Sequence, residues 1–272
     1  MEEIYLNPIH LFWIGSKFSP IEILCCKSCL KQGMTPVLWC YQEIKGIPAG
    51  VVIEDANTIL PIDTVNYYIE ALKLPIPNIS DLFRYRLLHK IGGIYSDTDI
   101  IFTDNIYQLN KTAYFCSTYE YNYGELANGC LMKLEKNSKI STFLLEEPNR
   151  RLINYIETGN DLHYCEFGPF VIQKCAAELN VEILKYDVIN PISWRWVNKL
   201  IAYKKIDRIF HIKLLVRKLL PFIYESKGYF VTKNTKAIHL CHEMWNTYEI
   251  NKYETMNSLS LYETLKIRFD RN

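Results

Sequence analysis

Hydrophobic and polar positions alternate in blocks along the first part of the chain, and these blocks predict strands that alternate with helices. The apolar run at 9–14 predicts a buried strand. Ser19-Pro20-Ile21-Glu22 combines an N-cap residue, a proline at the first helical position and a capping-box glutamate, so we expect a helix that reaches about Lys31. Further strands are expected at 36–41 and 51–54. This alternation is typical of a layered α/β sheet.

A second helix and the strand after it carry the most informative pattern of the chain. Ser80 is expected to cap a helix that ends at Gly92-Gly93. A short strand at 93–96 then leads into Asp97-Thr98-Asp99, and extended character resumes at 100–102. Two acidic residues therefore follow directly on a strand end. Later elements are expected as strands at 113–117 and 236–241 and as helices within 138–156 and at 169–179.

The composition is typical of a folded chain, and the net charge is close to zero. Of its 272 residues 49% are hydrophobic and 14% aromatic, which excludes a disordered chain. The formal net charge of +1 provides no chain-wide field for nucleic acid, so no nucleic-acid partner is expected. Nine cysteines, without a secretory leader pattern, favour a reducing, cytoplasmic location over a disulfide framework. We expect Cys25, Cys26 and Cys29 to be ordinary buried thiols.

One segment departs from this even balance of charge. Between Arg195 and Lys218 eight basic residues stand against the single acid Asp207, and leucines and isoleucines lie between them. This pattern is typical of an amphipathic helix that lies on an anionic membrane, with 195–222 as the contact. It fits equally well a pair of helices that pack on the core and expose a basic side.

The acidic triplet is the strongest candidate for chemistry. Two carboxylates separated by one residue at a strand end can face the same divalent cation, and oxygen ligands suit Mg²⁺ or Mn²⁺. Such a cation would neutralise the charge that develops on a departing diphosphate. An Asp-x-Asp alone is unspecific, because aspartates are also common in solvated turns after strands. Its interpretation therefore depends on the residues around it.

The residues around the triplet follow the pattern of a known family. Asp-x-x-Arg at 81–84, the Gly-Gly break at 92–93 and Tyr-x-Asp-x-Asp at 95–99 resemble the sugar-binding segment of glycosyltransferase family 32. This family contains the Och1-like and capsular-polysaccharide transferases and is related to the clostridial toxin glucosyltransferases. The first strand, with Trp13, is also similar. Looser matches follow at Asn128-Gly129, Gly168-Pro169 and His239.

The resemblance implies a fold and a set of residue roles. The fold is a single GT-A type α/β domain with a mixed, mostly parallel central sheet flanked by helices and a helical C-terminal elaboration. We expect a catalytic core at 1–194, a basic amphipathic helical insertion at 195–230 and a C-terminal segment at 231–272 that returns to the active site. The implied roles are base stacking for Trp13, ribose and sugar binding for Asp81 and Arg84, phosphate contact for Tyr95, donor contact for Asn128, and metal binding for Asp97, Asp99 and His239, with Asp97, Asp99 and Arg84 as the catalytic set.

Several of these residues also have ordinary interpretations. Arg84 could form a surface ion pair with Asp81 three positions earlier. Trp13 could be a core residue at the end of a buried strand. His239 could be a core histidine with its hydrogen bonds satisfied, and Asn128 could stabilise a turn with Gly129. His242 is assigned no role.

The resemblance finally implies a metal-dependent, retaining glycosyltransferase. Its donor would be a nucleotide-sugar, with UDP favoured, and its acceptor a hydroxyl of a growing, lipid-linked surface polysaccharide such as capsule or O-antigen. We expect a cytoplasmic protein, peripheral on the inner face of the membrane. Two alternatives stay open: a haloacid-dehalogenase-type phosphatase with Asp97 as nucleophile, and a non-catalytic membrane-surface binding protein on a transferase fold.

Overall fold

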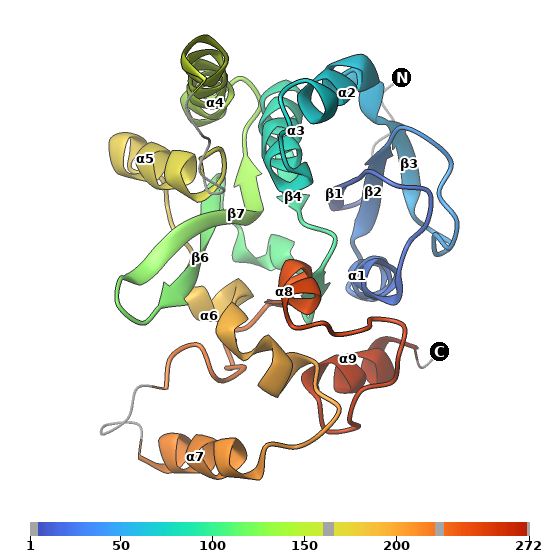
Figure 1. Cartoon of the computed structure of the whole chain (residues 1–272), viewed down its shortest axis with the longest axis vertical. Helices are drawn as coiled ribbons and strands as arrows, with labels where there is room; N and C mark the ends of the chain where they lie inside the picture. Colours follow the sequence, from blue (N-terminus) through green and yellow to red (C-terminus); the bar gives the residue numbers. More distant parts are fainter. Residues whose placement is uncertain (1–4, 160–165, 221–225, 271–272) are drawn as a thin grey trace.

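A six-stranded mixed sheet forms the centre of the molecule (Figure 1). The computed structural model describes residues 5–159, 166–220 and 226–270. The strands of the sheet are β1 (Pro8–Trp13), β2 (Thr35–Cys40), β3 (Val52–Asp55), β4 (Gly93–Ser96), β6 (Tyr114–Glu120) and β7 (Gly124–Leu134). Their order is β3-β2-β1-β4-β7-β6, and β7 is antiparallel to both of its neighbours. The predicted mixed, mostly parallel sheet is confirmed.

Helices cover both faces of this sheet (Figure 1). Leu11 of β1 belongs to one hydrophobic core and the next residue, Phe12, to the other, as expected when both faces of a sheet are buried. The first core contains residues of α1 (Pro20–Lys31) and α9 (Leu261–Asp270). The second contains residues of α2 (Ile62–Glu70), α3 (Ile76–Lys90), α4 (Lys139–Thr158) and α5 (Pro169–Leu179). The other helical elements are α6 (Tyr186–Ile189), α7 (Arg208–Leu219), α8 (His242–Thr247), a π-helical turn (Val197–Ile201) and short 3₁₀ turns at Ala56–Thr58, Ile106–Leu109 and Trp194–Trp196.

Helix α1 begins as the sequence predicts, whereas α3 does not. The capping box of α1 is complete: the Ser19 side chain accepts a backbone hydrogen bond, and the Ser19 backbone N–H donates to Glu22 Oε2 over 2.6 Å. Cys25, Cys26 and Cys29 lie buried in the core as free thiols. The prediction that Ser80 caps α3 is wrong, because the helix already begins at Ile76. Prolines before and within its first turn favour this earlier start.

The hairpin of β6 and β7 was only partly predicted. The sequence allows a turn at Asn128-Gly129, but both residues lie inside β7. Asn-Gly is a frequent turn sequence, which explains why the local pattern did not indicate a strand. The glycine is needed because α5 packs closely on β7: a Cβ at Gly129 would lie 2.6 Å from Ile172 Cδ1.

A second, two-stranded sheet connects the acidic triplet to the late part of the chain. β5 (Ile100–Phe102) pairs antiparallel with β8 (Ala237–His239), and Ile100 is the register partner of His239. The Leu240 N–H also donates to the Asp99 carbonyl over 3.0 Å. This pairing brings a histidine from the late part of the chain beside Asp99.

The basic segment predicted as one insertion at 195–230 divides into two parts. Val197, Ile201 and Ala202 are buried against the core, whereas every residue of α7 is at least partly exposed. Residues 221–225 of the predicted insertion lie outside the described residues. Within the described ranges, no helix is both long and apolar enough to cross a membrane.

Glu147 of α4 connects two helices and carries a testable pH dependence. Its carboxylate accepts hydrogen bonds from Arg150 and Arg151 on the same helix and from Lys174 on α5. Burial by itself would raise the pKa of Glu147, but these three cations outweigh it and lower the pKa from 4.5 to about 2. The charged form therefore stabilises the fold fully above pH 4.5, and this stabilisation is lost as the pH falls towards 2.

We expect Glu147→Gln to lower the free energy of unfolding by about 1–2 kcal/mol at neutral pH. This loss is smaller than the pKa shift alone would imply, because Arg150 is largely exposed and solvent screens its pairing with Glu147. Urea unfolding at several pH values measures the effect, which should shrink below pH 4.5. Glu146→Gln on the exposed side of the same helix is the control. Equal effects of the two variants would contradict the assignment.

Candidate active site

A cavity of about 460 Å³ lies at the carboxyl ends of β1 and β4, two neighbouring parallel strands. Trp13 ends β1, and Asp97 directly follows β4. The chain leaves β1 towards β2 on one side, while β4 lies on its other side. Open α/β sheets bind ligands at such a switch point, outside the carboxyl ends of the strands. The sequence-predicted residues that line the cavity are Trp13, Arg84, Tyr95, Asp97, Asp99, Asn128 and His239.

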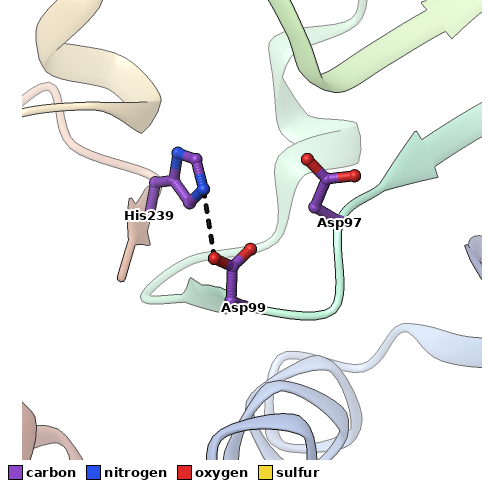
Figure 2. Close-up of side chains that lie close together, drawn as sticks. All are labelled: Asp97, Asp99 and His239. Carbon is purple, nitrogen blue, oxygen red and sulfur yellow. Dashed lines mark ion pairs between the residues drawn. The ribbon is translucent and has the colours of Figure 1, made fainter. Parts of the chain in front are cut away.

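Asp97, Asp99 and His239 surround a common space in this cavity (Figure 2). One ligand atom from each lies within 4.8 Å of the other two. Asp99 Oδ2 is 3.2 Å from His239 Nε2 and accepts a hydrogen bond of 2.7 Å from the backbone N–H of His242. Two carboxylates and an imidazole are a donor set that suits a divalent cation.

The charges of this trio differ in a way that the geometry explains. Burial by itself would raise the pKa of Asp99, but His239 and the His242 N–H lower it to about 2. Burial opposes the charged form of His239, yet the neighbouring Asp99 raises its pKa well above the usual range. Burial raises the pKa of Asp97 to about 6, against the attraction of Arg84. Because a ligating imidazole is neutral, a cation and this proton compete for Nε2.

Arg84 of α3 lies at the back of the cavity and connects several elements. Its Nη1 donates to the carbonyl of Gly129 over 2.5 Å, and its Nη2 donates to Asp97 Oδ1 over 2.9 Å. Nη2 also lies 3.2 Å from Ser80 Oγ, and the guanidinium stacks over the ring of Tyr95 at 4.8 Å. The structure therefore places Arg84 in a buried network instead of a surface ion pair.

Asp81 lies behind Arg84, away from the cavity. Its Oδ1 is 3.3 Å from Arg84 Nη2, and its carboxyl group packs so closely on Gly168 that a Cβ there would come within 2.7 Å. Burial raises the pKa of Asp81 to about 6, although Arg84 favours the charged form. Among the described residues that line the cavity, Asp81 is not present.

Trp13 and Asn128, which are also predicted to contact the nucleotide-sugar, differ in their hydrogen bonding. Trp13 lies edge-on to Phe18 at 5.5 Å, and its buried Nε1 has no hydrogen-bond partner within the described part of the chain. Asn128 Oδ1 instead accepts from Cys116 Sγ over 2.6 Å and from the Cys130 N–H over 3.3 Å. Trp13 thus offers an aromatic wall to the cavity, whereas the carbonyl oxygen of the Asn128 amide is already occupied.

Sequence reasoning missed Asn190, which orients His239. Asn190 Nδ2 donates to the Ser117 carbonyl over 2.7 Å, and this carbonyl can only accept. The amide orientation is therefore set, and Oδ1 accepts from His239 Nδ1 over 2.9 Å. Nε2 is left to face Asp99 and the common space. His242, which was assigned no role, also lines the cavity and holds Asp99 through its backbone.

We expect Asn190→Ala to weaken Mn²⁺ binding by about 10- to 100-fold, the usual effect of removing a partner that orients a metal ligand. Without Oδ1 the imidazole loses the contact that fixes its tautomer and ring position. Electron paramagnetic resonance of free Mn²⁺ measures the affinity in the purified protein. Asn154→Ala on α4 is the control, and an unchanged affinity of the Asn190 variant would refute the orienting role.

The family comparison identifies the class of the protein. Residues 27–116 match the family model described as "Glycosyltransferase sugar-binding region containing DXD motif". This range includes Arg84, Asp97 and Asp99, the residues that meet in the cavity. The chain is thus a glycosyltransferase. Among curated protein sequences, none matches it significantly.

Several solved glycosyltransferases are distantly similar in structure. PaToxG glycosyltransferase is 17% identical with a TM-score of 0.47, and the match covers 90% of this chain and 86% of that one. Apo GlyE of Streptococcus pneumoniae TIGR4 is 11% identical with a TM-score of 0.48, and the match covers 98% of this chain and 60% of that one. The UDP-bound glycosyltransferase domain of the YGT toxin is 10% identical with a TM-score of 0.41, and the match covers 98% of this chain and 86% of that one.

Proposed function

We propose that the chain is a metal-dependent, retaining glycosyltransferase of the Och1-like family 32. It would transfer a sugar from a UDP-sugar to a hydroxyl of a growing, lipid-linked surface polysaccharide in the cytoplasm. The convergence of Asp97, Asp99 and His239 within 4.8 Å carries this proposal. Carboxylate oxygens suit both Mg²⁺ and Mn²⁺, and the imidazole favours Mn²⁺.

The residues of the cavity fit the parts of such a donor. When bound, the cation supplies charge neutralisation for the diphosphate leaving group. Trp13 lines the cavity and offers a flat apolar wall for the nucleobase. Arg84 keeps Asp97 in place and adds positive charge behind the phosphates. The protein would act by positioning the acceptor hydroxyl on the face from which the leaving group departs.

A thermal-shift panel of UDP-, GDP- and CMP-sugars, each with and without Mn²⁺, tests the donor and the metal together. Ligands that bind the native state raise the apparent melting temperature. We expect the largest rise for a UDP-sugar in the presence of Mn²⁺. A rise that is independent of metal would refute the metal-dependent part, and a larger rise with a GDP-sugar would refute the choice of nucleotide.

Two alternatives predict different outcomes. A phosphatase would need Asp97 as a free nucleophile, but Arg84 binds this carboxylate over 2.9 Å and the segment matches a sugar-binding region. Labelling of Asp97 by a phosphate donor would nevertheless establish it. A non-catalytic binding protein would not hydrolyse a nucleotide-sugar when Mn²⁺ is added. The anomeric configuration of the glycosidic bond formed on the acceptor, compared by proton NMR with that of the donor sugar, decides whether configuration is retained.

A further inference from the structure

The structure separates the basic residues between 195 and 218 into two groups. In the first group Arg195 pairs with Glu120, Lys199 with Asp207, and Lys204 with Glu254. These pairs neutralise the part of the segment that packs on the core. The second group has no acidic partner within the described part of the chain and is exposed; it consists of Lys205, Arg208, Lys213 and Lys218. The unpaired positive charge is therefore concentrated on and next to α7.

Helix α7 also exposes a row of large apolar side chains. Ile209, Ile212, Leu215 and Leu219 are 68%, 61%, 61% and 78% exposed. Their spacing of three and four residues places them on one face of the helix, which we call the α7 stripe. Lys213 and Lys218 project from the helix on either side of this stripe, as the helical period of 3.6 residues requires. An apolar face with flanking cations is the pattern of a helix that lies in a membrane interface.

The opposite face of α7 attaches the helix to the rest of the molecule. Phe210 stacks near Trp196 at 5.2 Å, and His211 contacts the ring of Tyr203 at 5.5 Å. Asp207 caps the helix by accepting a hydrogen bond of 3.0 Å from the Phe210 N–H. In Figure 1 the helix lies at the lower edge of the molecule, far from the central sheet. The α7 stripe is thus held outward by packing on its other side.

We propose that the α7 stripe docks the protein on a membrane that contains anionic lipids. The apolar side chains would enter the boundary between headgroups and acyl chains, and the unpaired cations would meet lipid phosphates. Charge decides between this occupant and a second copy of the chain. Two α7 helices facing each other would bring like charges together, because Arg208–Leu219 contains no acidic residue and the N-cap Asp207 already pairs with Lys199. This repulsion opposes association. An anionic surface complements the same charges.

Vesicle sedimentation of the full chain tests this docking surface. We expect about tenfold or more protein to sediment with vesicles of phosphatidylcholine and phosphatidylglycerol than with phosphatidylcholine alone, and high salt to reduce the difference. Ile212→Glu with Leu215→Glu should abolish binding, and Lys213→Ser with Lys218→Ser should remove the preference for anionic vesicles. Ile153→Glu with Ile156→Glu is the matched control, because these exposed isoleucines have the same spacing on α4.

Each outcome bears on the proposal. Equal sedimentation with both kinds of vesicle, no sedimentation, or equal loss in the α4 control would overturn it. Self-association in light scattering that the α7 variant abolishes, without vesicle binding, would show that a second copy occupies the stripe. Hydrolysis of a soluble nucleotide-sugar, measured without vesicles, should be the same in the α7 variant and the unmodified chain. A chain that binds vesicles but lacks this hydrolysis would refute the proposed enzymatic function and leave the docking surface intact.

Discussion

Asp99→Asn is expected to lower the rate of Mn²⁺-dependent donor turnover by about three orders of magnitude. A cation that neutralises a leaving group contributes several kcal/mol to transition-state stabilisation, and each 1.36 kcal/mol is a factor of ten in rate. Asp99 is the member of the trio whose charge is most secure, because its pKa is lowered to about 2. Removing this charge leaves Asp97 and His239 without their central partner. Release of UDP from a UDP-sugar at saturating Mn²⁺ measures the change.

The asparagine variant separates chemistry from folding. Its side-chain oxygen can still accept the hydrogen bond from the His242 N–H, so the connection to α8 is kept. We expect an unchanged circular dichroism spectrum and similar thermal stability. Asp104→Asn is the control, because Asp104 lies just beyond the other end of β5 and pairs with Lys236 outside the cavity. Full turnover by the Asp99 variant would end its assignment as a metal ligand.

Arg84→Met is expected to lower the free energy of unfolding by about 3–5 kcal/mol, the range for removing one partner from a buried ionic network. The substitution leaves the carboxylates of Asp81 and Asp97 without their shared cation. It also leaves the Gly129 carbonyl without its donor. Urea unfolding at neutral pH measures the loss. Arg86→Met, on the same helix but bound to Asn149 at 3.2 Å, should cost no more than about 1 kcal/mol.

A second substitution tests the cause of this loss. Asp81→Asn in the Arg84→Met background should recover part of the stability, because it removes a buried charge that has no partner. The loss should also be smaller near pH 4 than at neutral pH. The pKa of Asp81 is raised to about 6 in the native state, so its carboxyl group is already protonated near pH 4. A neutral Asp81 no longer needs Arg84 as its counter-ion. Equal stability of the Arg84 and Arg86 variants would show that the network has no such role.

Local signals predicted the elements that they encode directly. The capping box at 19–22 lies within one helical turn, and α1 begins there. The glycines at 92–93 end a helix because both adopt positive φ, at 78° and 94°, and the strand that carries the triplet follows. Asp97 and Asp99 could therefore be placed at a strand end before their surroundings were known.

Tertiary contacts decided the rest. Asn190 and His239 are 49 positions apart, and they meet only because β8 pairs with β5. No local sequence pattern predicts this long-range contact. The sequence of the basic segment fits both a membrane-bound helix and a helix packed on the core, since periodicity cannot show which face of a helix has a partner. In the structure, the segment 197–202 packs on the core, whereas all residues of α7 are at least partly exposed.

The pairing of β5 with β8 has a consequence for how the protein is made. A nascent chain that has left the ribosome only as far as β7 already contains both aspartates and Arg84, but not the imidazole. The trio is complete only when residue 239 has been made as well. Chains that stop before β8 lack His239 and are therefore expected to be inert towards the donor.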